Sequence, residues 1–183
     1  MKNKLNLRDF DFEQINIIKW EIAEGEIKVD VHYAKVPAYF KLAGIGVDPG
    51  RNFGLATLDG KEAWVFSGSL PQAPVKWQYG IMAYDLPSNP QRYHGQGKAV
   101  VEGPAYKEPF GQAELGHVRM GFVLGLYYAG FEVDVVPPAT IRANALGSGK
   151  VGGLEIWPDL PHNGADAMAA ALCAAGLLKG DTE

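Results

Sequence analysis

Three acidic residues stand where a carboxylate could take part in chemistry. Asp48 ends a short apolar run and precedes a Pro-Gly turn, so it is expected where a buried strand emerges, although a turn-capping Asp is the alternative. Glu102 ends a second apolar run, and Asp166 lies near the start of an Ala-rich final helix. Gathered carboxylates repel one another unless a cation lies among them. Because carboxylate and water ligands suit hard cations, the pattern indicates Mg²⁺ or Mn²⁺.

Two polar residues immediately before the final helix could extend this acidic group. Asn163 and Asp166 are three residues apart, so they are expected to share one face at the start of the helix. The Asn163 amide oxygen, or a water held by it, could complete a metal shell, while an ordinary N-cap is the alternative. His162 could be a metal ligand, a proton-transfer group or a surface residue.

The segments that must position these side chains alternate in an α/β pattern. Residues 42–47, 53–58 and 63–68 predict three consecutive strands, and Asp59-Gly60 indicates a hairpin between the second and the third. Further along the chain, strands are expected over 99–102 and 131–136, and helices over 75–86, 112–129, 138–146 and 164–178. Three strands followed by alternating strand and helix predict a mixed sheet covered by helices. Residues 147–161 are expected to be irregular.

The first 41 residues have a different pattern. Polar and apolar residues alternate strictly over 26–33 and loosely over 15–20, which predicts a hairpin with one solvated face. This hairpin could be an appended arm or an extra edge of the sheet. We therefore expect an N-terminal extension over residues 1–41 and a main domain over residues 42–183.

Composition restricts the function of this 183-residue chain. A net charge of −4, from 17 basic and 21 acidic residues, argues against binding nucleic acid by bulk charge alone. Residues 88–150 hold six Lys or Arg against five acids, so this region becomes net positive if metal ions neutralise the buried acids. Since no apolar run approaches the length of a membrane span and the single Cys173 cannot form an internal disulfide, we predict an intracellular protein with no membrane contact.

Three motifs together resemble those of RuvC-type Holliday junction resolvases, which are metal-dependent nucleases of the ribonuclease H-like fold. They are the sequence GIGVDPG at residues 44–50, VVE at 100–102 and ADAMA at 165–169, in order over roughly residues 42–178. The resemblance implies an α/β fold: a ribonuclease H-like mixed five-stranded sheet with helices on both faces, here with an N-terminal β-rich extension. It also implies a homodimer that cuts two opposed strands of a four-way DNA junction, in the cytoplasm of a bacterial cell or a phage-infected host.

The resemblance further assigns roles to single residues. The four metal-binding positions of the family correspond to Asp48, Glu102, Asn163 and Asp166, with two Mg²⁺ or Mn²⁺ ions per site. Asp48 would bridge both ions, Glu102 would bind one, and Asp166 with either Asn163 or His162 would bind the other. The family usually has Asp or His where Asn163 stands, and an additional helix for which residues 147–161 are too short.

The DNA contacts implied by the resemblance have alternatives among the ordinary structural roles. Lys150 or Arg142 would contact a phosphate near the cut, or would be a solvated surface cation. Tyr106 could stack on bases unpaired at a junction, or pack in the core. The complete set of candidate DNA-binding residues is Arg51, Tyr106, Lys107, Arg142 and Lys150. The glycines of the predicted helix 112–129, at positions 116, 121 and 125, are compatible with packing in a dimer or on the protein's own sheet.

Other functions remain possible on the same sequence. Another ribonuclease H-like nuclease would cut flaps or other branched DNA, and a catalytically inactive DNA-binding protein would keep the fold without cutting. An actin-like or sugar-kinase ATPase also begins with an acid-bearing strand and a glycine turn. That class needs two such domains, and 183 residues are too few for both.

Overall fold

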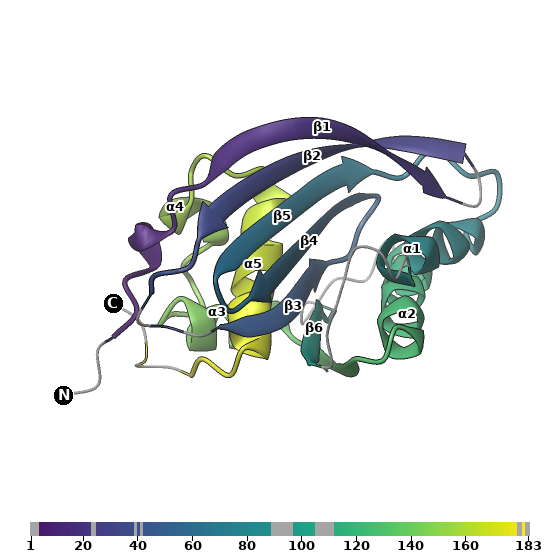
Figure 1. Ribbon diagram of the computed structural model, residues 1–183. Helices are drawn as coiled ribbons and strands as arrows, with labels where there is room; N and C mark the ends of the chain where they lie inside the picture. The colour runs from purple at the N-terminus through teal and green to yellow at the C-terminus, as the bar shows by residue number, and fades with distance from the viewer. Residues whose placement is uncertain are drawn as a thin grey trace.

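The fold is built around one seven-stranded sheet (Figure 1). The computed structural model describes residues 4–22, 25–38, 40, 42–88, 97–104, 112–178 and 181. The strands are β1 (Glu13–Ile22), β2 (Gly25–Lys35), β3 (Ala43–Asp48), β4 (Asn52–Asp59), β5 (Glu62–Ser69), β6 (Lys98–Glu102) and β7 (Glu132–Val136). They lie in the order β1-β2-β5-β4-β3-β6-β7. Neighbouring strands pair antiparallel, except that β6 pairs parallel with both β3 and β7.

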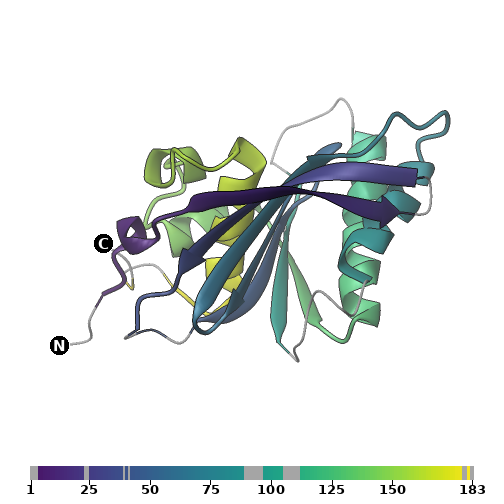
Figure 2. The same cartoon turned by 45° about the horizontal axis from the view of Figure 1, so that its top comes forward.

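Helices cover both faces of the sheet, as predicted (Figure 2). The helical elements are the 3-10 turn η1 (Leu7–Asp9) and the helices α1 (Gln78–Ser88), α2 (Gln112–Tyr128), α3 (Pro138–Ala145), α4 (Gly153–Ile156) and α5 (His162–Ala174). One apolar core lies between the sheet and the pair α1 and α2, and the other lies between the sheet and α3, α4 and α5. Among the described residues, no helix is long and apolar enough to cross a membrane.

Helix α5 lies directly on the backbone of β3 and β4. A Cβ atom on Gly46 would collide with the Ala167 carbonyl group, and one on Gly54 would collide with the Asn163 carbonyl group. Because these two strand positions carry no side chain, the helix approaches the strands without a layer of side chains between them. This contact brings the start of α5 beside the end of β3, where Asp48 lies.

The N-terminal extension forms part of the sheet. Strands β1 and β2 form the predicted hairpin, and β2 pairs antiparallel with β5 from Val29↔Gly68 to Lys35↔Glu62. The five predicted strands thus become seven, and of the two alternatives for the hairpin the extra sheet edge is confirmed. Before the hairpin, residues 5–12 contribute four buried apolar side chains to the core on the α5 side, namely Leu5, Leu7, Phe10 and Phe12.

Two helix boundaries differ from the prediction for identifiable reasons. Residues 75–78, expected to open the first helix, instead form a turn of i→i+3 hydrogen bonds, so α1 begins at Gln78. The last helix ends at Ala174 because Gly176 adopts a positive φ of 85° and the Leu177 amide donates to the Leu172 carbonyl, a common helix stop. The segment expected to be irregular contains the single turn α4.

The glycines of α2 have an intramolecular explanation. A Cβ on Gly121 or Gly125 would collide with the backbone carbonyl of Gly80 or Tyr84 in α1, whereas Gly116 has no atom within 4 Å of that position. Close packing within the chain is therefore confirmed for two of the three, against helix α1 rather than against the sheet.

Candidate metal centre

Acidic side chains from a strand and a helix converge at one edge of the sheet. Asp48 is the last residue of β3, while His162 and Asp166 lie one turn apart at the start of α5. The ligand atoms of these three residues all lie within 4.8 Å of one another. This spacing is compatible with a single cation held by two carboxylates and one imidazole.

Glu102 reaches the same edge on the neighbouring strand. Strand β6 runs parallel to β3 with Val101 opposite Val47, so the residues that end the two strands, Glu102 and Asp48, are neighbours. Parallel strands bring their carboxyl ends to the same edge of a sheet, which is how the two acid-ending runs of the sequence come together. The charge of Glu102 also acts on Asp48, and that of Asp166 acts on Glu102.

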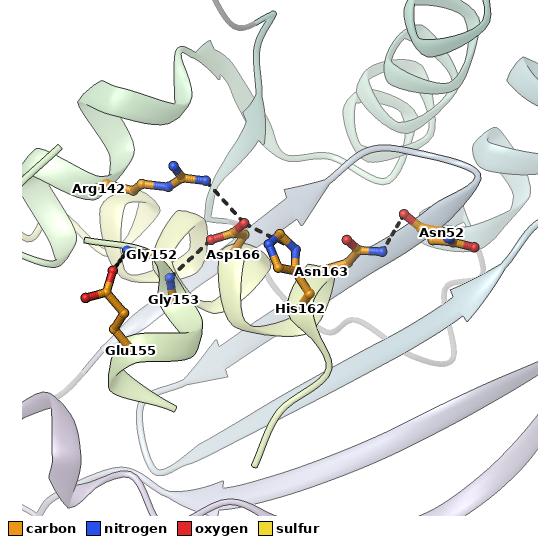
Figure 3. A network of polar contacts seen from close by, with 8 residues as sticks. All are labelled: Asn52, Arg142, Gly152, Gly153, Glu155, His162, Asn163 and Asp166. Carbon is orange, nitrogen blue, oxygen red and sulfur yellow. Dashed lines mark hydrogen bonds and ion pairs between the residues drawn. The ribbon is translucent and has the colours of Figure 1, made fainter. Parts of the chain in front are cut away.

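Asp166 is fixed by donors on both carboxylate oxygens (Figure 3). Its Oδ2 accepts from Arg142 Nη2 at 3.3 Å and lies 3.7 Å from His162 Nδ1, while its Oδ1 accepts from the Gly153 N–H at 3.3 Å. The side chain is only 7% exposed, and a buried carboxylate is costly without such partners. Gly153 can come so close because a Cβ there would lie 2.6 Å from the Ala165 carbonyl group.

The electrostatics of the site favour a cation. Burial, reinforced by the charges of Glu102 and Asp166, raises the pKa of Asp48 well above its ordinary value, against the opposing effect of Arg142 and Arg119. Burial together with the charge of Asp166 likewise raises the pKa of Glu102 from 4.5 to about 7. A divalent ion among these carboxylates would offset the repulsion and the desolvation that raise both pKa values.

Asn163 has a hydrogen-bond role that the sequence did not reveal. Its Nδ2 donates to the Asn52 carbonyl oxygen at 2.7 Å, which ties the start of α5 to the start of β4 (Figure 3). Its neighbour His162 is the residue that lies within ligand distance of Asp48 and Asp166. The assignment of Asn163 or His162 to the metal shell therefore stays a prediction.

The remaining predicted site residues are more dispersed. Arg142 lies within the site, with its side chain 29% exposed and in contact with Asp166, so it is not simply a solvated cation. Lys150 and Arg51 are exposed, and the Arg51 guanidinium lies 5.8 Å from the centre of the Tyr79 ring. Tyr106 and Lys107 lie outside the residues that the structure describes, and their DNA contacts stay predictions.

Sequence reasoning overlooked Arg119 and Gly153. Arg119 reaches across from α2, donates from Nε to the Glu102 carbonyl oxygen at 2.8 Å, and lowers the pKa of both Glu102 and Asp48. A signal was available for Arg119, because it is the only Lys or Arg in the 17 residues of α2. No comparable signal exists for the Gly153 amide, since any backbone N–H could have met Asp166.

Comparisons with known proteins agree with this architecture. No protein-family model matches the chain, and no curated protein matches it. Among solved structures, the chain is similar to Thermus thermophilus RuvC, at 19% identity and a TM-score of 0.52, over 72% of this chain and 91% of the other. It is also similar to T. thermophilus RuvC in complex with a Holliday junction substrate, at 20% identity and a TM-score of 0.55, over 75% of this chain and 98% of the other. The chain therefore has a RuvC-like, ribonuclease H-like fold.

Proposed function

We propose that this protein is a divalent-metal-dependent endodeoxyribonuclease that resolves four-way DNA junctions, acting in the cytoplasm of a bacterial cell or a phage-infected host in DNA recombination and repair. The observation that carries the proposal is the convergence of Asp48, Glu102 and Asp166 at one sheet edge of a RuvC-like fold. The raised pKa values of Asp48 and Glu102 support a cation at this place, because burial and mutual repulsion both disfavour the charged carboxylates.

The residues at the site can be assigned to the steps of phosphodiester hydrolysis. Two divalent ions, when bound, would activate a water and stabilise the leaving oxygen. Asp48 would hold both ions, Glu102 one of them, and Asp166 with His162 or Asn163 the other. His162 is exposed at the rim, where its imidazole can accept or deliver a proton.

Arg142 is placed to bind the phosphate that is cut. Its guanidinium already lies at the acid cluster, and a planar fork of N–H donors suits two phosphate oxygens. Neutralising the acids with metal would leave the positive charge of Arg142 available to a phosphate at this edge. Lys150, Arg51, Tyr106 and Lys107 complete the proposed DNA contacts.

Cleavage of a labelled synthetic four-way junction, with and without Mg²⁺ or Mn²⁺, tests the proposal. We expect metal-dependent, paired and symmetric nicks on the junction, and none on linear duplex of the same sequence. Asp48→Asn should reduce the rate by at least about 100-fold while junction binding persists. Asp59→Asn is the matched control. Asp59 pairs with the first residue of β3, whereas Asp48 is the last residue of that strand. The Asp59 Oδ1 accepts from the backbone of the β4–β5 turn.

The outcomes distinguish the alternatives. Equal cutting of flaps and junctions would keep the metal centre but replace the junction preference by a broader branched-DNA nuclease. Tight junction binding with no cutting in either metal would favour an inactive DNA-binding protein. A wild-type cutting rate in Asp48→Asn would refute the metal-centre assignment.

A homodimer is the second part of the proposal, and helix α2 supports it. Its outer face carries an apolar stripe at helical spacing, with Met120, Leu124, Tyr127 and Tyr128 exposed by 55%, 41%, 65% and 70%. The opposite face of α2 lies in the core through Val118, Phe122 and Leu126, which are fully buried, so the stripe is directed away from the protein's own core. A second copy would bury this stripe and supply the second active site that paired nicks require.

Sedimentation at micromolar concentration tests the dimer. We expect the wild type to sediment as a dimer and Leu124→Arg to sediment as a folded monomer that nicks single strands without pairing. Ile17→Arg is the control, because Ile17 is 57% exposed on β1, far along the sheet from α2. A wild type that remains monomeric on junction DNA would contradict this part of the proposal.

A further inference from the structure

The segment of residues 5–12, which we call the N-terminal strap, is anchored in the core rather than projecting from it. Its apolar side chains Leu5, Leu7, Phe10 and Phe12 are between 0% and 7% exposed. The Leu5 N–H also donates to the Asp181 carbonyl oxygen at 2.9 Å, which joins the strap to the C-terminal part of the chain. The strap is therefore a structural component of the α5 side of the fold.

The principal contact of the strap is with Trp157. The Trp157 Nε1–H donates to the Leu7 carbonyl oxygen at 2.9 Å, and the indole is only 3% exposed. The rings of Phe10 and Phe12 each meet the indole edge to face, with centroids 6.4 Å away. Removing one partner of a buried hydrogen bond leaves the other unsatisfied, so this contact fixes the position of Trp157.

Trp157 in turn closes the short helix α4. Its backbone N–H donates to the Gly153 carbonyl oxygen at 2.9 Å, and its carbonyl accepts from Leu160 N–H at 3.2 Å. A helix of four residues is not stable by itself, because the conformational entropy lost in forming the first turn exceeds the free energy gained from its hydrogen bond. The order of α4 thus depends on contacts with the rest of the protein, and the strap supplies those around Trp157.

The first residue of α4 reaches the metal centre. The Gly153 N–H donates to Asp166 Oδ1, and Gly153 lies against the α5 backbone at Ala165. A continuous series of contacts therefore runs from Leu7 through Trp157 and Gly153 to Asp166. At its end, Oδ1 is held by the amide while Oδ2 faces Arg142 and His162.

We propose that the N-terminal strap is a positioning element for the metal centre. Through Trp157 it holds α4 against α5, so that the Gly153 amide keeps Asp166 in the orientation in which Oδ2 faces Arg142 and His162, among the residues that would hold the cation. Trp157 is a positioning residue, since its buried indole contacts the strap and its backbone closes α4, away from the acid cluster. The metal half of this inference rests on the proposed function, whereas the mechanical coupling of the strap to α4 can be tested without metal.

The test compares Trp157→Phe with Trp64→Phe. Both changes keep an aromatic ring and remove an indole donor, since Trp64 Nε1–H donates to Glu62 Oε2 at 3.2 Å. Trp64 lies on β5 between Ala63 and Val65, which pack in the α5-side core, so its own ring lies on the opposite face of the sheet. Two quantities are measured: amide hydrogen exchange over residues 153–166 in EDTA, and Mn²⁺ affinity by calorimetry.

We expect Trp157→Phe to speed exchange over residues 153–166 by about 10-fold and to weaken Mn²⁺ binding by about 3- to 10-fold, while Trp64→Phe changes neither. Unchanged exchange in Trp157→Phe would overturn the inference. Faster exchange with unchanged Mn²⁺ affinity would also overturn it, because Trp157 would then be merely structural. If Trp157→Phe does not fold, Phe12→Leu loosens the same contact and carries the same expectations.

Failure of the proposed function gives a different result. A wild type that binds no Mn²⁺ would overturn the metal centre and, with it, the positioning role. Hydrogen exchange in EDTA would still report whether the strap orders α4. If the wild type and Trp157→Phe bind Mn²⁺ equally tightly, the positioning role of the strap is overturned while the metal centre stands.

Discussion

Replacing Glu102 by glutamine is expected to stabilise the metal-free protein at alkaline pH, although it removes a ligand of the proposed centre. The folded protein holds a proton on Glu102 up to about pH 7, because burial and the Asp166 charge raise its pKa from 4.5 to about 7. The unfolded chain releases that proton near pH 4.5. Since the folded state binds more protons between these values, the free energy of unfolding falls as the pH rises through this window.

The size of the effect follows from the pKa difference. The rise from 4.5 to about 7 corresponds to up to about 3 kcal/mol, present below pH 4.5 and lost above pH 7. Glutamine has no charge to desolvate, so the variant avoids this loss. For a chain of this length, about 3 kcal/mol corresponds to roughly 6–12 °C in Tm.

Thermal unfolding in EDTA at pH 5 and pH 8 measures this difference. We expect the Tm of Glu102→Gln to exceed that of the wild type at pH 8 and to approach it at pH 5. Adding Mg²⁺ at pH 8 should then raise the Tm of the wild type more than that of the variant. The exposed Glu132 on the adjacent strand provides the control, because Glu132→Gln should change stability by less than about 0.5 kcal/mol. A wild type that is as stable as Glu102→Gln at both pH values would refute the reasoning.

Three further substitutions test the surroundings of the centre. Asn163→Asp is expected to keep or raise cleavage, because it adds a carboxylate; complete loss in a folded variant would show that the amide has an essential role. Gly153→Ala should lower the Tm by several degrees and weaken Mn²⁺ binding in calorimetry, because the new methyl group collides with α5. Gly152→Ala meets no atom closer than 3.9 Å and should change neither, so equal effects would contradict this account. Arg142→Gln should destabilise the EDTA-treated protein by about 1–3 kcal/mol in denaturant titration, since the buried Asp166 carboxylate loses its guanidinium partner. An unchanged denaturation midpoint would argue against that contact.

The sequence was sufficient to predict the sheet edge that carries the acids. Apolar runs that end in Asp48 and Glu102 are local signals, and the parallel pairing of β3 with β6 brings both acids to the same edge. The close contact of α5 with this edge follows from Gly46 and Gly54, which are small for a reason that becomes visible only when the helix is in place. The structure brings these acids together, and their role as metal ligands stays a prediction.

Contacts between distant parts of the chain could not be predicted in this way. The hydrogen bond from Trp157 to Leu7 joins residues that are 150 positions apart, and no periodicity in either segment indicates it. The amide of Asn163 was a candidate ligand on its chemistry, but its contact with Asn52 depends on how β4 meets α5. Side-chain partners of this kind are set by packing, which a single sequence does not encode locally.

The absence of a side-chain layer between α5 and β3 has a consequence for how this protein can change over evolutionary time. Backbone contact at Gly46 sets the distance between the strand that carries Asp48 and the helix that carries Asp166. Substitutions elsewhere in the two apolar cores are expected to change the melting temperature and to leave this backbone contact in place. The spacing between Asp48 and Asp166 would then persist while other parts of the sequence diverge.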